Sequence, residues 1–364
     1  MMLFHGSYRP DDVEFLLKPI EIPFIEDLAR KEALIQSGER HYSEMLSPER
    51  VPSEHYLALF HKAHAANRER LARDCMRLTR LLVEQHGQDL TVVSLARAGT
   101  PIGAVVRHLA EKLHGIRPAH FSVSIIRDRG IDAVALHEIL ERGHQPEGIA
   151  FVDGWTGKGV ISRELATAVS AFNENCGTAI DSGLNVLTDL AGSAARAASG
   201  EDYLIASSIL NSTISGLVSR SIMNEAIGPG DYHGCVYFEQ FASHDLSRWF
   251  VDDVVDASLE LHRRDGNPIV NAPSRAAQAA ISRGYMGAAL RRYGITDENL
   301  IKPGIGEATR VLLRRFPERV IVRDPSCDRV AHLLALAAEK SVPVDVDAVL
   351  PYHAVSIIRS ACDA

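Results

Sequence analysis

Apolar positions along the chain follow two different periods. From Ser53 to Gln85 they recur every three or four residues, which is the spacing of one buried helix face, and the pattern ends at Gly87. From Leu90 onward, short apolar runs rich in β-branched residues alternate with stretches of helical spacing. The pattern therefore predicts one or two long amphipathic helices, followed by a region in which strands and helices alternate.

The alternating region predicts a parallel sheet. Apolar runs indicate strands at residues 90–95, 119–126, 149–152 and 184–187, and helical spacing occupies residues 102–113 and 161–172. Strand, turn, helix and strand in this order are typical of crossover connections between parallel strands. The runs are apolar almost throughout, without alternation, which favours a sheet covered by helices on both faces.

A second, smaller α/β pattern begins near residue 300. Helical spacing at residues 306–315 and 328–340 brackets a strand at 319–322, and Val342 opens another strand. A stretch rich in Ala and Arg separates this pattern from the first one. We therefore predict three parts: a large α/β domain at residues 1–270, a helical connector at 271–299, and a small α/β domain at 300–364.

Composition and charge limit the classes of protein that fit. The chain has 364 residues, of which 46% are hydrophobic and 24% charged, as in ordinary globular proteins. The net charge is −8, and residues 301–364 carry +1, which leaves −9 on the first 300. This balance argues against nonspecific nucleic-acid binding by the whole surface, and it suggests that the two parts do different jobs. No apolar run is long enough to span a bilayer and no secretory signal opens the chain, so we expect a cytoplasmic protein without a membrane partner.

The strongest chemical signal follows the apolar run at 149–152. It consists of Asp153, Gly154, Thr156, Gly157, Lys158 and Gly159, with Trp155 among them, and a helix begins directly afterwards. Backbone N–H groups of such a loop point at one spot, where the helix dipole favours a phosphate, and glycines allow close approach. Lys158 is followed by Gly159 rather than Ser or Thr, so the segment is not a Walker A loop. The alternative is a plain strand–turn–helix junction with Asp153 as its N-cap.

This segment resembles the signature of the type I phosphoribosyltransferases, in which four apolar and two acidic residues precede a Thr/Gly-rich loop. The resemblance implies that the loop binds the 5-phosphate of phosphoribosyl pyrophosphate. It also implies that Asp153, on the second acidic position, contacts the ribose hydroxyls and the Mg²⁺ that accompanies this substrate. Val152 occupies the first acidic position, so half of the grip on the ribose hydroxyls is missing.

Further candidate contacts lie in three other segments. Arg97, Ala98, Gly99 and Thr100 resemble the pyrophosphate loop of the same enzymes; the alternative is a tight turn with an exposed Arg. Arg127 lies in a polar loop, and Asn211, Ser215 and Arg220 are polar positions within an apolar frame. We consider these four as contacts to a substrate base, with a solvated loop and close helix packing as the alternatives.

Most of the chain resembles a family found in bacterial tellurium-resistance and stress gene clusters. That family joins a divergent phosphoribosyltransferase domain to a C-terminal Pelota-like RNA-binding domain, and some members are labelled cysteine protease StiP. The resemblance implies a type I phosphoribosyltransferase-like parallel sheet with added helices. It also implies an enzyme that binds phosphoribosyl pyrophosphate or a nucleotide and transfers the phosphoribosyl group in a stress-linked pathway. A cysteine protease and a catalytically inactive nucleotide- or RNA-binding sensor are the alternatives.

The protease alternative is tested by the positions of the cysteines. Cys235 lies two residues from His233, a spacing that rarely brings two side chains to hydrogen-bond distance, and we expect Cys176 to lie in a Gly-flanked turn with no His nearby. The five cysteines form no CxxC pair, which argues against a zinc site or a disulfide framework. We therefore expect the thiols of Cys176 and Cys235 to be dispensable for activity.

The C-terminal segment Lys302–Arg310 resembles the first helical turn of Pelota and of kink-turn-binding ribosomal proteins. Glu307 and Arg310 fall on positions that face RNA in that family, while Gly306 replaces an Asn. The resemblance implies RNA as a partner, with a protein-docking domain as the alternative. A homodimer remains open.

Overall fold

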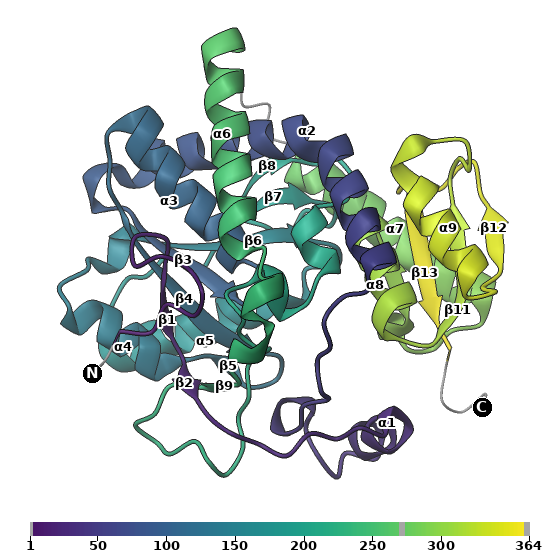
Figure 1. The fold of residues 1–364 in the computed structure, drawn as a ribbon, viewed down its shortest axis with the longest axis horizontal. Coiled ribbons are helices and arrows are strands. Elements are labelled where there is room, and N and C mark those ends of the chain that lie inside the picture. Colours follow the sequence, from purple (N-terminus) through teal and green to yellow (C-terminus); the bar gives the residue numbers. More distant parts are fainter. Residues whose placement is uncertain (1–2, 269–273, 360–364) are drawn as a thin grey trace.

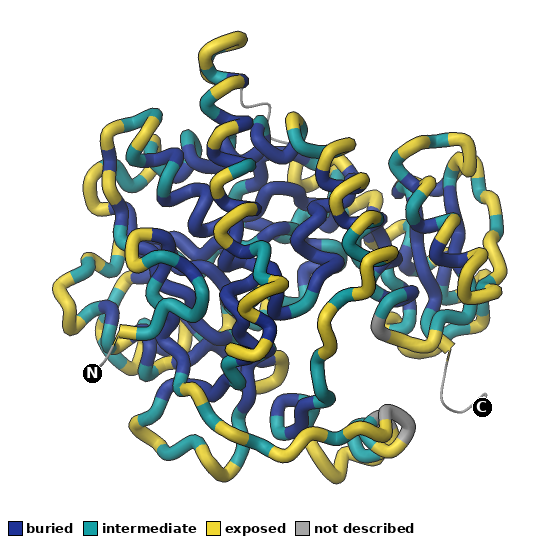
Figure 2. The backbone as a smooth tube through the Cα atoms, viewed as in Figure 1, coloured by how far each residue is buried: buried dark blue, intermediate teal, exposed yellow. Residues whose placement is uncertain are grey.

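The computed structural model describes residues 3–268 and 274–359, which form two α/β units side by side (Figure 1). The mixed α/β class, with a mostly parallel central sheet and a small C-terminal α/β domain, is confirmed. One hydrophobic cluster extends through both units, since Leu204 and Ile209 of the first unit belong to the same buried cluster as Ile305 and Leu312 of the second. Figure 2 shows this buried interior running through both units.

The first unit is built on a seven-stranded sheet. In spatial order its strands are β1 (Glu14–Leu16), β4 (Ala119–Ile126), β3 (Thr91–Ala96), β6 (Ile149–Thr156), β7 (Leu184–Asp189) and β8 (Arg196–Ser199), and β5 (Gly130–Ile131) pairs with β4. Every pair along the main path is parallel, and only β5 runs antiparallel. The four predicted strands are therefore confirmed, and β6 extends four residues beyond its predicted end.

Helices cover both faces of this sheet, as the uniformly apolar strands predicted. On one face lie α2 (Glu54–His86), α3 (Thr100–His114) and α6 (Ser247–Asp265), and on the other α4 (Ala133–Glu141) and α5 (Val160–Cys176). The two layers have separate buried clusters. Leu78 and Ile102 belong to the first cluster, whereas Leu136 and Leu165 belong to the second.

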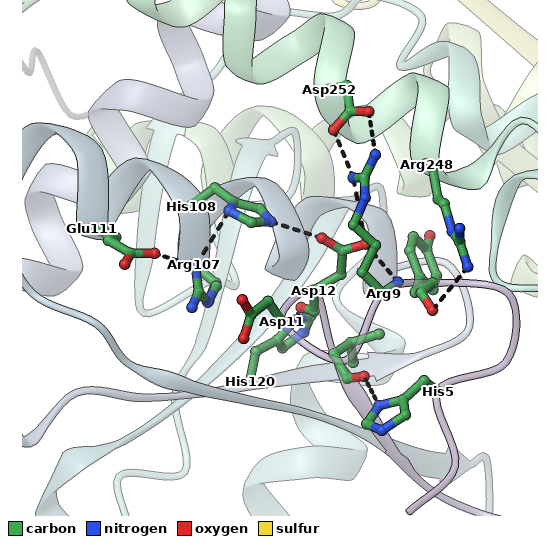
Figure 3. A network of polar contacts seen from close by, with 12 residues as sticks. His5, Arg9, Asp11, Asp12, Arg107, His108, Glu111, His120, Arg248 and Asp252 are labelled. Carbon is green, nitrogen blue, oxygen red and sulfur yellow. Dashed lines mark hydrogen bonds and ion pairs between the residues drawn. The ribbon is translucent and has the colours of Figure 1, made fainter.

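The N-terminal segment is fastened to the sheet and to two helices by Asp12, whose side chain is buried, and by Arg9 (Figure 3). Its carboxylate accepts hydrogen bonds from His108 Nε2 of α3 and from the Arg9 N–H, both at 2.8 Å. The main-chain oxygen of Asp12 contacts His120 Nδ1 on β4 at 2.6 Å. Arg9 in turn makes a bidentate contact with Asp252 on α6. These contacts hold β1 at the edge of the sheet.

Two smaller elements complete the first unit. The two-stranded sheet of β2 (Lys18–Pro19) and β9 (Gly234–Cys235) and the short helix α1 (Leu28–Gln36) lie outside the main layers. Among the described residues, no helix combines the length and the apolar character that crossing a membrane requires.

The second unit is a four-stranded sheet with three helices. Its strands, in spatial order, are β10 (Ile301–Pro303), β13 (Ala354–Ile358), β11 (Pro317–Val322) and β12 (Val344–Val346), and its helices are α7 (Arg275–Tyr293), α8 (Ile305–Arg314) and α9 (Ala331–Glu339). The predicted helices and strands of this region are present. Helix α7, from the predicted connector, packs on the sheet through Met286 and Ala289. Residues 269–273 of that connector lie outside the described residues.

A buried carboxylate joins the two units. Asp202 follows β8, and its two oxygens accept hydrogen bonds from the backbone N–H groups of Ile305 and His353, each at 2.8 Å. Ile305 is the first residue of α8, so Asp202 satisfies one of the free N–H groups at that helix start. The small domain is therefore docked through specific polar contacts as well as through apolar packing.

Candidate functional site

The carboxyl ends of β3 and β6 lie where the chain changes direction across the sheet. From β3 the chain passes through α3 to β4 on one side, whereas from β6 it passes through α5 to β7 on the other. The two strands pair from Thr91 to Ser94 and then part. Open parallel sheets bind ligands at such a switch point, outside the carboxyl ends of the strands.

A cavity of about 320 Å³ lies at this point, and the second unit closes it. From the first unit it is lined by the β6–α5 segment and by Ala98 and Arg127. From the second unit, residues of β10 and α8 complete the lining, among them Lys302, Glu307 and Arg310. The structure thus brings together predicted phosphate-loop residues and predicted RNA-contact residues, which the sequence analysis had placed in separate sites.

The predicted phosphate loop is shorter than expected. Strand β6 continues through Thr156, so only Gly157, Lys158 and Gly159 separate it from α5. Thr156 Oγ1 accepts a hydrogen bond from the Gly159 N–H at 3.0 Å and lies 3.0 Å from Ser193 Oγ. The hydroxyl therefore closes the turn, and the six predicted residues form a strand end plus a tight turn rather than one open loop.

Two ionisable groups of this segment are strongly influenced by their surroundings. Burial raises the pKa of Asp153 to about 6, although the Gly154 N–H and Arg310 favour the charged form. Burial, followed by the charge of Lys302, lowers the pKa of Lys158 to about 8. Lys158 Nζ donates a hydrogen bond to the main-chain oxygen of Glu298 at 2.7 Å. The cavity therefore combines desolvated groups of both signs.

Helix α8 presents its polar side to the first unit. The Arg310 guanidinium lies over the Trp155 ring, 5.8 Å from its centroid, and donates to Glu307 Oε1 at 3.3 Å. Burial acts to raise the pKa of Glu307, but Arg310 and the two lysines outweigh it and leave that pKa lowered. The predicted RNA-contact residues Glu307 and Arg310 therefore face the cavity, where their role toward RNA stays a prediction.

The predicted pyrophosphate loop is used differently. Arg97 donates to Glu49 Oε1 at 2.6 Å and to the main-chain oxygen of Val218 at 2.8 Å, and both charged side chains are largely buried. A Cβ atom on Gly99 would lie 2.6 Å from the Val152 oxygen, so Gly99 is a packing contact. Thr100 Oγ1 lies 2.7 Å from Ser122 Oγ. Of the four predicted residues, Ala98 lines the cavity.

The predicted contacts to a substrate base also divide into one residue that lines the cavity and three that do not. Arg127 lines the cavity. Asn211 donates to the main-chain oxygen of Arg50, Ser215 Oγ donates to that of Asn211, and Arg220 donates to that of Met45. These three side chains hold the backbone of the segment between β8 and β9 in place, which agrees with the packing alternative.

A cysteine–histidine pair lies elsewhere, on the α4–α5 face of the sheet. Cys176 Sγ, at the last residue of α5, lies 3.6 Å from Nε2 of His137 on α4. The His137 ring packs against Phe172, with ring centroids 4.8 Å apart. The expectation that Cys176 has no histidine nearby is wrong, because two helices separated by a strand in the sequence are neighbours on one sheet face. Their places before and after β6 are the signal that would have revealed this.

The other described cysteines have different surroundings. Cys75 and Cys235 are fully buried, and burial raises the pKa of both thiols. As the i, i+2 spacing predicted, His233 is not the partner of Cys235: its Nδ1 lies 2.7 Å from Ser124 Oγ. Cys327 is partly exposed, at the start of a short 3₁₀ turn in the second unit. Cys362 lies outside the described residues.

Comparison with known proteins assigns both parts of the chain. Residues 6–255 match the family described as tellurite-like stress resistance cysteine protease StiP, and residues 280–360 match the PELOTA RNA binding domain. The chain is 39% identical over 367 residues to "Cysteine protease StiP" of Acinetobacter baylyi (strain ATCC 33305 / BD413 / ADP1). The match covers 98% of this chain and 94% of that protein.

These matches overturn phosphoribosyl transfer as the function, and with it the description of the protein as an enzyme of nucleotide metabolism. The relative is named as a cysteine protease, which was the alternative. Two features agree with the correction: Val152 replaces an acidic residue, and Arg97 is held in a buried ion pair away from the cavity. The predicted Mg²⁺ stays a prediction. By its match over most of its length, the chain belongs to the StiP family.

Proposed function

We propose that the protein is a cysteine protease in which Cys176 is the nucleophile and His137 the general base. The observation that carries this proposal is the 3.6 Å distance between Sγ and Nε2. Among the described cysteines, Cys176 combines a histidine neighbour with partial exposure to solvent. The described cysteines are free thiols, which suits a reducing compartment such as the cytoplasm.

The proposed chemistry follows from this pair. His137 takes the thiol proton as Sγ attacks the peptide carbonyl carbon, and it returns the proton to the leaving amine. Water then hydrolyses the thioester and restores the thiol.

Hydrolysis of casein or a fluorogenic peptide library by the full-length protein tests the proposal. Cys176→Ser and His137→Ala should each lower kcat/KM by about 100-fold or more, as expected on losing a nucleophile or a general base. Cys327→Ser is the matched control, since Cys327 is also partly exposed but lies in the other unit. Wild-type activity in a folded Cys176→Ser protein would exclude this nucleophile.

RNA binding by the second unit is a second proposal, supported by the match of residues 280–360 to the PELOTA RNA binding domain. Arg310 lies on the cavity-facing side of α8, so we expect RNA to meet the protein at the mouth of the cavity. Arg310→Glu in the full-length protein should weaken binding of structured RNA and reduce the slope of log K against log salt by about one. Equal affinity and slope in a filter-binding titration would contradict this placement.

We propose that the sheet of the first unit has the strand arrangement of the type I phosphoribosyltransferases. We do not propose that the unit catalyses their reaction. The strand order and the position of its switch point support this relationship. Fold and activity are separable, since one fold hosts many functions. Superposition of an experimental structure on members of that fold, strand by strand, is the test.

A further inference from the structure

The first unit covers the start of α8, which lies on the side of the second unit that faces it (Figure 1). Asp202 accepts a hydrogen bond from the N–H group of Ile305, and Ile305 is fully buried. A Cβ atom on the preceding Gly304 would lie 2.6 Å from Leu190 Cδ1 and 3.4 Å from Asp202 Oδ1. This helix start is therefore closed to other ligands while the two units are docked.

Trp155, near the end of β6, covers the next turn of α8. A Cβ atom on Gly306 would lie 3.5 Å from the Trp155 ring, so the ring packs directly on the helix backbone. The Arg310 guanidinium lies 5.8 Å from the centroid of the same ring. The side chains of Glu307 and Arg310 keep 26% and 38% of their surface exposed. The polar side of α8 is therefore only partly accessible.

The segment that leads into α8 is held from the same direction. A Cβ atom on Gly157 would lie 3.2 Å from the main-chain oxygen of Pro303, which shows how closely the two backbones approach. Lys158 Nζ donates a hydrogen bond to the main-chain oxygen of Glu298 at 2.7 Å. The contacts of the first unit thus extend along the second unit from Glu298 to Arg310.

The covered segment lies within the part of the chain on which the proposed RNA binding rests. Residues 280–360 match the PELOTA RNA binding domain, and Glu307 and Arg310 are the predicted contacts. Helix starts and arginines are groups that proteins use to bind nucleic-acid phosphates, and bases stack on guanidinium planes. In the docked protein the carboxylate of Asp202 occupies the helix start, and the ring of Trp155 lies beside the arginine. The first unit therefore places an anion and an aromatic ring where RNA would place a phosphate and a base.

We propose that docking and RNA binding use the same surface of the second unit, so that RNA must displace the first unit from the start of α8. This inference rests on the proposed RNA binding. The partial exposure of Arg310 at the mouth of the cavity gives RNA a first contact before the units separate. If the competent form is only partly populated, the apparent affinity is reduced by that fraction. Weaker docking therefore means tighter RNA binding.

Fluorescence-polarisation titration of the full-length protein with a labelled kink-turn RNA hairpin tests this competition. Asp202→Ala and Trp155→Ala should each bind at least about fivefold more tightly than the wild type, because each removes a docking contact and leaves Glu307 and Arg310 in place. Asp12→Ala is the matched control. Asp12 is also a buried carboxylate that accepts a backbone N–H hydrogen bond, but its partners all lie in the first unit, so the RNA affinity should stay unchanged.

A second measurement leaves the docking surface intact. The chain has two tryptophans, so Trp249→Phe leaves Trp155 as the only one. Saturating unlabelled RNA should make the Trp155 fluorescence more accessible to quenching by acrylamide, because the ring loses its cover from α8. RNA that binds without separating the units would leave this accessibility unchanged or lower it, and either result would overturn the proposal.

The outcomes distinguish this inference from the RNA binding on which it rests. If the wild type binds the hairpin and the folded Trp155→Ala and Asp202→Ala variants bind it no more tightly, the shared surface is wrong and RNA binding stands. If neither the wild type nor any variant binds the hairpin, both proposals fail. Thermal unfolding checks the fold of each variant. Should Asp202→Ala not fold, Trp155→Ala and the quenching measurement decide.

Discussion

At the scale of single residues, Lys158 shows how burial acts on a charged side chain. Its pKa is lowered to about 8 by burial and by Lys302, against the opposing charges of Glu298, Glu307 and Asp297. A folded pKa below the ordinary value of 10.5 means that the charged form is less favourable in the folded chain, and this cost fades as the pH rises above about 8. We therefore predict that Lys158→Met raises the free energy of unfolding at pH 7 and changes it less at pH 10. Urea unfolding at the two pH values measures this, and equal effects at both would argue against a desolvated charge at Lys158.

At the scale of elements, the N-terminal segment depends on Asp12 (Figure 3). Burial acts to raise the pKa of this carboxyl, but the hydrogen bonds from His108 and from the Arg9 N–H prevail and lower it. A lowered folded pKa means a stabilising contribution that is present above the unfolded value of about 3.8 and is lost as pH falls through the folded value. Asp12→Ala should therefore reduce the free energy of unfolding by about 2–4 kcal/mol at pH 7, and by less below pH 4. Urea unfolding measures this. Asp11→Ala is the control, because the neighbouring Asp11 side chain is exposed and pairs with Arg117, and it should change the free energy of unfolding little. Equal effects of the two substitutions would argue against a role for burial.

At the scale of the whole molecule, Asp202 couples the two units. It is the buried acceptor for the N–H groups of Ile305 and His353, and removal of its side chain leaves both without a partner. Asp202→Ala should lower stability by about 2–3 kcal/mol and uncouple unfolding of the second unit from that of the first. Calorimetric unfolding checks both effects. Asp202→Asn, which keeps one acceptor oxygen, should lose less stability. A single transition in Asp202→Ala would show that apolar packing alone holds the units together.

The sequence by itself determined the local elements and their order. Uniform apolar runs predicted the buried strands, and helical spacing predicted the helices between them. The strand-end position of Asp153 to Gly159 marked one edge of the cavity, because residues that follow parallel strands gather at the same edge of a sheet. These signals are short in range, so they are visible in any segment read alone. The cavity-lining position of Arg127 also followed from its place after β4.

The partners of these residues were decided by the tertiary structure. Arg97 has the local sequence of an anion-binding arginine, yet Glu49, from a distant segment, binds it. Cys176 gained His137 from a helix 39 positions away, and Glu307 and Arg310 met Trp155 only because the second unit docks on the first. A side chain's charge and reach are properties of the residue. The partner of a side chain depends on how segments that are distant in the sequence pack against one another. A charge that this packing buries needs an oppositely charged or hydrogen-bonding partner, which the local sequence does not specify.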